Sequence, residues 1–391
     1  MTQITQAEYE DVRDQLLNEN TYDLTHNLDG TKNKDKLTVT QTVMDSTWTA
    51  YQNISDAECN DTIFMKLQLP LTRRVVPNLL AWELMGVQAI KKDLDQIYAL
   101  QLTYKNSESN DNLSAVSKET SKQLAIQIVK LIANATQNKF FNVNFNGYLD
   151  DSDIDMSNMV YRELLDALTY EIISELDVAV LVHLRKISSI DFDYDQSKIV
   201  NPVAKLSRLQ KILKFFRLYK DTKQTPITLS DQHAGIILLI NRACNRIAAR
   251  SRRGAGNWVV VSPTALTILG SSNSKYFSPA SRDNADMPHA EYVPSRFVGT
   301  LCNDIKVYCD PYARDDTPVL VGFKGSGEID SGIFLAIYQL VQQALKLDPI
   351  SFMHINKISA QYELVDNNTN VSGANDYYSQ ISINTKTLSF I

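Results

Sequence analysis

The chain has 391 residues, 44% of them hydrophobic and 21% charged, so it can build one large domain or two interleaved domains and is not disordered as a whole. Its formal net charge of -6 argues against tight nonspecific binding of nucleic acid, which relies on lysine and arginine to neutralise phosphates. The four cysteines lack the density of a disulfide scaffold and the spacing of a zinc site, no signal peptide opens the sequence, and no apolar run reaches the roughly 18 residues of a membrane span.

The first 60 residues are polar and predict an arm with no core of its own. Within this arm, residues 7–17 predict a short helix, and Asp29-Gly30 marks a turn in the loop 27–36. The segment 63–70 is apolar and begins the part of the chain that can build a core.

Beyond Pro77, a short helix is expected around residues 79–85. Residues 96–104 are rich in β-formers and predict a strand. The polar stretch 105–120 predicts a long loop, and a long polar loop in a globular chain is usually functional or mobile.

The clearest helix is expected over residues 157–188, where apolar side chains recur at spacings of three and four. A helix of this length spans roughly 45 Å at 1.5 Å per residue. It is therefore expected to form the spine of a flat, extended domain.

A second helix, over 203–220, is basic, and its cations spread around it beside apolar residues. We interpret it as an ordinary solvated helix, with a face that binds DNA or membrane as the alternative. A third helix is expected from an N-cap at Ser230 to Arg252, with Gly254 as its stop. Strands are then expected at residues 258–261, 305–308 and 319–323, so the fold class is α+β.

Enzyme motifs are scarce in this sequence. The five histidines do not have the spacing of metal ligands, and neither a nucleophile elbow nor a phosphate-binding loop is present. Gly322–Gly327 is interpreted as a turn between strands, and the cluster Asp191, Asp193 and Asp195 as a loop with exposed charge, a divalent-cation site being the alternative. We therefore predict no catalytic residue, no cofactor and no metal.

Four segments, in order along the chain, resemble the major capsid (head) proteins of T-even-like myoviruses, a family of tailed bacteriophages. They are Arg73 to Gln88 with Glu83 and Gly86, Arg253 to Ser262, Val307 to Ala313, and Val321 to Phe334. The resemblance implies the fold shared by tailed-phage capsids, encapsulins and the herpesvirus capsid floor. Its parts are an N-terminal arm, an extended β loop, a peripheral domain with a long spine helix, and an axial domain.

The resemblance also implies a division of the chain. The expected parts are an N-terminal arm at 1–60; a peripheral strand segment at 61–130 with the extended loop at about 97–125; a peripheral domain at 131–224 with the spine helix at about 157–188; an axial domain at 225–340; and a return to the peripheral domain with a C-terminal tail at 341–391. Because the chain is short for this family, a domain inserted near the extended loop is expected to be missing. Glu19 is a candidate for the cleavage after glutamate that relatives undergo.

The function implied is that of a major capsid protein, not an enzyme. Its subunits would self-assemble into hexameric capsomers of an icosahedral or prolate shell that encloses phage double-stranded DNA without sequence-specific binding. The alternatives are a pentamer-forming vertex protein of the same family and an encapsulin-like shell protein. The expected location is the virion, after synthesis in the host bacterial cytoplasm and without a membrane. Vertex, portal, scaffold and decoration proteins are possible partners besides the chain itself.

Charged residues within or beside the resembling segments are our candidates for intersubunit contacts. Such contacts would set register and specificity more than affinity. The candidates are Arg73, Arg74, Glu83, Arg252, Arg253, Lys324, Glu328 and Asp330.

Overall fold

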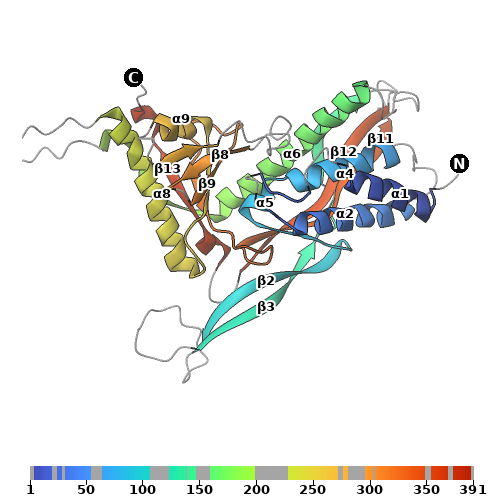
Figure 1. Ribbon diagram of the computed structural model, residues 1–391, viewed down its shortest axis with the longest axis horizontal. Coiled ribbons are helices and arrows are strands. Elements are labelled where there is room, and N and C mark those ends of the chain that lie inside the picture. The colour runs from blue at the N-terminus through green and yellow to red at the C-terminus, as the bar shows by residue number, and fades with distance from the viewer. Residues whose placement is uncertain are drawn as a thin grey trace, which may run out of the picture.

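The computed structural model describes most of the chain and confirms the α+β class. The described residues are 4–19, 24–28, 31–53, 64–105, 123–137, 139–146, 159–198, 228–271, 276–280, 296–302, 304–347, 354–368 and 373–388. They form a four-stranded sheet, a seven-stranded sheet and a two-stranded hairpin, with helices packed around the two sheets (Figure 1). The expected basic helix 203–220 lies outside the described residues.

The four-stranded sheet has the order β1-β11-β12-β4. Its strands are β1 (Gly86–Ala89), β11 (Ile333–Leu347), β12 (His354–Asp366) and β4 (Lys139–Asn146). β1 runs parallel to β11, whereas β11 and β12, and β12 and β4, are antiparallel. The expected spine helix is confirmed as α6 (Met159–Ile187), which contributes Leu165, Ile172 and Leu176 to the core beside this sheet.

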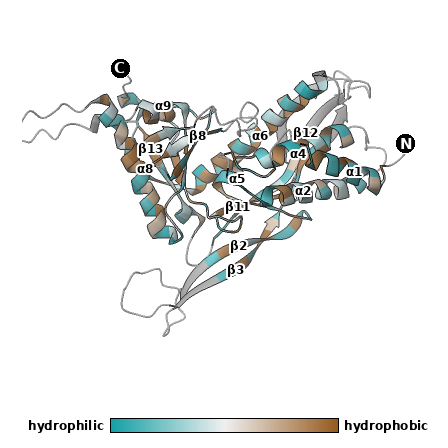
Figure 2. Ribbon diagram, in the orientation of Figure 1, coloured by the Kyte–Doolittle hydropathy of each residue, from teal (hydrophilic) through white to brown (hydrophobic). Residues whose placement is uncertain are grey.

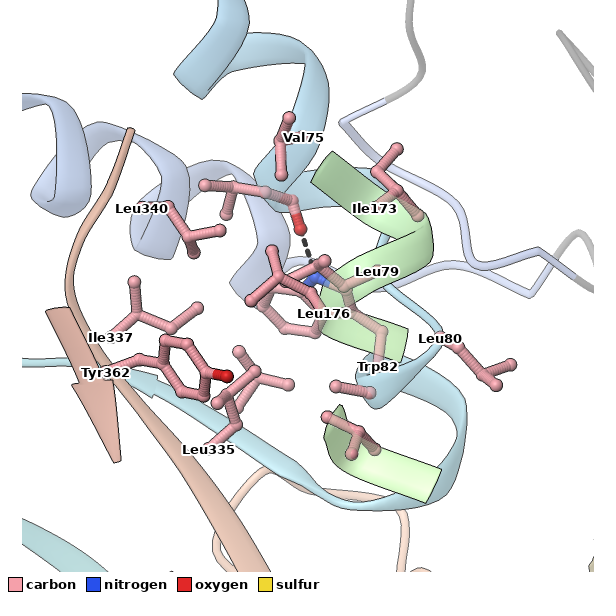
Figure 3. Close-up of a cluster of buried hydrophobic side chains, with 14 of the residues drawn as sticks. Val75, Leu79, Leu80, Trp82, Ile173, Leu176, Leu335, Ile337, Leu340 and Tyr362 are labelled. Carbon is pink, nitrogen blue, oxygen red and sulfur yellow. Dashed lines mark hydrogen bonds between the residues drawn. The ribbon is translucent and has the colours of Figure 1, made fainter. Parts of the chain in front are cut away.

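The main core lies where α6, the short helices after residue 64 and β11 meet (Figure 3). Trp82, Leu176 and Leu335 are fully or almost fully buried there. The indole nitrogen of Trp82 donates to the backbone oxygen of Val76 at 2.7 Å, which removes the cost of burying an unpaired N–H. The short helices are η1 (Phe64–Gln68), α4 (Leu69–Val75), η2 (Val76–Asn78) and α5 (Ala81–Leu84).

The seven-stranded sheet has the order β5-β13-β10-β6-β9-β8-β7 and lies at the other end of the molecule (Figure 1). Its strands are β5 (Ser189–Tyr194), β13 (Tyr378–Ile383), β10 (Val319–Gly322), β6 (Trp258–Val261), β9 (Ile305–Cys309), β8 (Arg296–Leu301) and β7 (Phe277–Pro279). The central strands β6 and β10 are buried along their whole length, as their unbroken apolar sequences predict. Short 3-10 turns occur at η3 (Gln196–Lys198), η4 (Ala374–Tyr377) and η5 (Thr385–Thr387).

Helices α8 (Leu229–Ser251) and α9 (Pro263–Ser271) pack with the seven-stranded sheet. The expected N-cap at Ser230 is wrong by two residues. Thr228 caps α8, because its hydroxyl accepts from the backbone N–H of Asp231 while the Asp231 carboxylate accepts from that of Thr228. The helix ends where Arg252 adopts a left-handed conformation, with φ of 54°.

The N-terminal segment carries two helices that dock on the body of the molecule and share a core with it. Helices α1 (Gln6–Leu17) and α2 (Asp35–Gln52) pack with η1 and α4 around Tyr9, Met44 and Trp48. The sequence did not predict α2 because its composition is polar. Four threonine hydroxyls of α2 donate to carbonyl oxygens one turn earlier, so these polar groups are satisfied within the helix. The apolar side chains of α2 remain free to face the body.

A long hairpin of β2 (Leu94–Lys105) and β3 (Gln123–Asn134) projects from the body (Figure 1). The strands pair without a break from Leu94 opposite Asn134 to Lys105 opposite Gln123. The strand expected at 96–104 is confirmed. The loop expected at 105–120 lies, beyond Lys105, outside the described residues.

Candidate intersubunit contact surfaces

Most of the charged candidates are bonded within the chain. Glu83, on α5, has a side chain only 1% exposed. Its carboxylate accepts from the Tyr308 hydroxyl of β9 at 2.7 Å and from the Leu28 backbone N–H at 2.6 Å. This carboxylate therefore ties the N-terminal segment and the seven-stranded sheet to the main core.

A second acidic residue holds the edge of the four-stranded sheet. The Glu328 carboxylate lies 2.9 and 3.0 Å from Lys324 Nζ and accepts from the Val87 backbone N–H at 2.8 Å. Asn33 of the N-terminal segment donates to it at 3.3 Å. Lys324 and Glu328 are thus brought together, as neighbours in one connection between β10 and β11.

The arginine candidates also have partners in the chain. Arg253 donates to both carboxylate oxygens of Asp330, with Nε 3.0 Å from Oδ1, and this hydrogen bonding raises the pKa of Arg253. Arg74 lies 2.6 Å from Asp166 of α6. The intersubunit role of these residues stays a prediction. Within the chain their charges already stabilise the fold.

Arg73 is buried at the end of α1. Its Nε donates to the backbone oxygen of Leu16 at 3.0 Å, and its Nη2 to that of Glu19 at 3.2 Å. A guanidinium at the last carbonyls of a helix interacts favourably with the negative end of the helix dipole. Arg252 is half-buried at the end of α8.

The outer face of the hairpin is a further exposed surface, and none of the charged candidates lies on it. In an antiparallel pair, residues opposite one another point to the same face. The inner face packs Ile97, Ala99 and Ala133 against Phe334 and Ala336 of β11.

The outer face of the hairpin carries large apolar side chains into solvent. The exposed fractions are 57% for Leu94, 46% for Tyr98, 63% for Ile128 and 70% for Ile132. Figure 2 shows apolar and polar segments alternating along the hairpin. The sequence contained a signal for this surface. A strand with apolar residues at both odd and even positions has two apolar faces, and both are then expected to be covered.

Of the aspartate cluster after α6, Asp191 and Asp193 lie on β5 and Asp195 directly follows it, so the exposed loop that the sequence predicted is not found there. Asp191 accepts from Arg250 at 2.7 and 2.8 Å and from the Ser379 hydroxyl at 2.7 Å. Burial by itself would raise the pKa of Asp191, but hydrogen bonds from Arg250, Ser379 and Ser189 outweigh it and lower that pKa below its usual range. Among the described residues, no group of three or more potential ligands could hold a metal ion.

The described cysteines are free thiols. Cys244 and Cys309 are buried, Cys302 is exposed, and burial raises the pKa of Cys244 to about 12. A thiol with so high a pKa is a weak nucleophile at neutral pH. In the part of the chain that the structure describes, no helix is long and apolar enough to cross a membrane.

Comparison with known proteins gives consistent similarities. The family model described as major capsid protein Gp23 matches residues 62–156 and 151–383. The major capsid protein of Escherichia phage AR1 is 22% identical over 297 residues, covering 69% of this chain and 57% of that protein. That of Salmonella phage ViI is 31% identical over 103 residues, covering 26% of this chain and 23% of that protein. This chain thus spans little more than half the length of the first of these relatives.

Solved structures give matches of low similarity. The mature capsid of bacteriophage PhiM1 matches with a TM-score of 0.40 and 11% identity, over 79% of this chain and 88% of that chain. A virus-like particle from Pyrococcus furiosus matches with a TM-score of 0.37 and 10% identity, over 81% of this chain and 98% of that chain.

Proposed function

This chain belongs to the family of the major capsid protein Gp23, and from this premise we propose that its subunits assemble with one another into the shell of a tailed phage. The family match carries the proposal. It extends from residue 62 to residue 383 and contains all four resembling segments, so the resemblance drawn from the sequence is confirmed. The implied fold is that of tailed-phage capsids.

The parts of that fold can be assigned to the elements of the structure. We propose that the four-stranded sheet with α6 is the peripheral domain, the seven-stranded sheet with α8 the axial domain, and the β2–β3 hairpin the extended loop. The boundaries expected from the sequence then need adjustment. β5 and β13 lie outside 225–340 but belong to the seven-stranded sheet, whereas β11 begins inside that range and belongs to the other sheet.

The outer face of the hairpin is proposed to cover a neighbouring copy of the chain. Full burial of one side chain such as isoleucine stabilises an interface by roughly 1.5–3 kcal/mol before the costs of association. Four exposed apolar residues make a modest contact, but a shell repeats it at every subunit. Weak repeated contacts let misplaced subunits dissociate while the closed assembly remains stable.

Ile132 provides the test of this surface. An Ile132→Asp substitution places a charge in the proposed contact and should abolish shells while the free subunit unfolds at the unchanged temperature, because Ile132 is 70% exposed there. Ile132→Leu keeps the apolar side chain and serves as the matched control. Sedimentation and negative-stain microscopy are the measurements, and shells of Ile132→Asp at the wild-type yield would contradict the proposal.

The geometry of the shell is a finer part of the proposal. Hexagonal sheets, tubes or closed shells from the purified chain would identify a hexamer-forming subunit of the virion, and pentamers would identify the vertex protein. The portal, vertex, scaffold and decoration partners, the enclosed DNA and synthesis in the host cytoplasm stay predictions.

A further inference from the structure

The side chain of Gln88 forms two hydrogen bonds with the backbone of the hairpin near its base. Its Oε1 accepts from the Tyr98 backbone N–H at 2.9 Å, and its Nε2 donates to the Tyr98 backbone oxygen at 2.7 Å. A glutamine amide has the donor and the acceptor of a peptide unit. It therefore pairs with Tyr98 as a neighbouring strand would.

The edge of β2 that faces away from β3 is anchored at two successive outward positions. In an antiparallel strand, backbone N–H groups point alternately to the two sides. The Tyr98 N–H goes to Gln88, and the next outward one, that of Leu100, donates to the backbone oxygen of Ile329 at 2.7 Å. One anchor is thus a backbone group of the body, and the other is the amide of a single side chain.

Gln88 is itself held firmly. It lies on β1, paired with Ala336 of β11, and its Nε2 also lies 3.2 Å from the backbone oxygen of Glu328. The Glu328 carboxylate accepts from the Val87 N–H and is fixed in turn by Lys324. At Gly86, a Cβ atom would lie 2.4 Å from the Glu328 backbone oxygen, so β1 packs closely against the connection between β10 and β11.

The hairpin has other contacts with the body. The Asn134 backbone N–H donates to Glu363 at 2.5 Å, and the Gln101 amide donates to Asn367 at 3.1 Å. Each of these is a single hydrogen bond, whereas Gln88 makes a pair to one peptide unit, and the inner face rests on the body through Ile97, Ala99 and Ala133. Apolar contact has no preferred direction, whereas a hydrogen bond weakens steeply when its angle falls below roughly 120°. A pair of hydrogen bonds to one peptide unit therefore defines an angle that the apolar contact leaves open.

We propose that Gln88 is a positioning residue that sets the direction in which the β2–β3 hairpin leaves the body. It thereby places the outer apolar face where a neighbouring subunit can meet it. The consequence for assembly rests on the proposed function, whereas the hold on the hairpin is a property of the single chain.

The first test is amide-resolved hydrogen exchange of the free subunit with Gln88→Met. Methionine has nearly the same shape but no amide, so Tyr98 N–H should exchange about tenfold faster, as expected for the loss of one hydrogen bond. If Gln88 positions the hairpin, Leu100 N–H should also exchange faster, although its partner Ile329 is untouched. Amides that pair β2 with β3 should not change, because the hairpin moves as a unit.

The matched control is Gln127→Met, the same substitution at an exposed residue of β3, which should leave both amides at the wild-type rate. Gln88→Asn keeps an amide but is one methylene shorter, and it should behave as Gln88→Met does. It replaces that variant if Gln88→Met fails to fold.

The second test is assembly of the same variants. Wild-type shells should have one diameter, whereas shells of Gln88→Met should be fewer and spread over several diameters. Unchanged Leu100 exchange, or faster exchange with shells of wild-type yield and diameter, would overturn the positioning role. If the wild-type chain forms no shells, the proposed function fails, and hydrogen exchange alone then decides on Gln88.

Discussion

Asp191 shows how one carboxylate can join three elements. It lies on β5, its side chain is 4% exposed, and it binds Arg250 of α8 and Ser379 of β13. A carboxylate in such surroundings stays ionised because its hydrogen bonds favour the charged form. Its charge therefore stabilises this corner of the seven-stranded sheet.

Because the folded pKa of Asp191 lies below the unfolded value of about 3.9, its contribution to stability is present above that pH and is lost as pH falls through the folded pKa. Asp191→Asn should cost about 2 kcal/mol at pH 7 and less at pH 3, which lies below the unfolded pKa. Urea unfolding at both pH values measures this. Asp193→Asn, at the exposed carboxylate two residues on, should have a small effect at either pH. A cost of Asp191→Asn that is the same at pH 3 would show that the charge is not its source.

The sequence could indicate which residues are important. It could not indicate which groups those residues contact. Lys324, Glu328, Arg253 and Asp330 stand in segments that resemble the family, so they were found. Their partners lie as far as 295 residues away, as in the pair of Asn33 and Glu328. Only the packing of the folded chain brings such groups together, and a sequence without its fold cannot say that they pair internally.

Among the elements, α1 is held by a small core that it shares with α2, η1 and α4. Tyr9 stacks on Trp48 with ring centroids 4.6 Å apart, and its hydroxyl donates to Asp45 at 2.8 Å. Burial of the phenol and the neighbouring Asp45 carboxylate raise the pKa of Tyr9 far above its usual value. The tyrosine thus remains neutral and keeps the helix docked.

Tyr9→Ala should release α1, since loss of a buried aromatic side chain costs about 3 kcal/mol or more. Trypsin should then cut after Arg13 faster than in the wild type while the remainder of the chain stays folded. Tyr9→Phe keeps the stacking and loses one hydrogen bond, worth about 1 kcal/mol, so its cleavage rate should rise much less. Equal cleavage of all three chains would mean that Tyr9 does not hold the helix.

Elements with a regular apolar pattern could be predicted, and those without one could not. α6 and α8 repeat their apolar residues every three or four positions, and β6 and β10 are unbroken apolar runs. β11 was missed because bulges interrupt its pairing with β12 between Ile337 and Gln342. A bulge shifts the alternation of side chains, so the period of two residues that reveals a strand is lost there.

At the scale of the whole molecule, the bond between Glu83 and Tyr308 joins the main core to the seven-stranded sheet. Glu83→Gln should cost about 2 kcal/mol, and Tyr308→Phe about 1 kcal/mol. A double-mutant cycle by urea unfolding should give a coupling of at least about 0.5 kcal/mol, as contacting residues do. Additive effects would show that the two residues act independently and that this bond does not link the two parts.

The overall architecture could be expected from family resemblance more than from patterning. Composition and periodicity established the α+β class and the long helix. They could not show that the chain leaves the seven-stranded sheet to build β11 and β12 and returns to it for β13. Such returns depend on pairings between distant segments, which leave no local signal in the sequence.

The place of β13 has a consequence for how the protein is made. This strand lies between β5 and β10, so β5 has no partner in its sheet until residues 378–383 have been translated. A ribosome that stops before β13 releases a chain in which β5 has no partner strand and β10 is left at the edge of the sheet. The order of strands thus acts as a check on translation, because only polypeptides synthesised through residue 383 can complete this sheet.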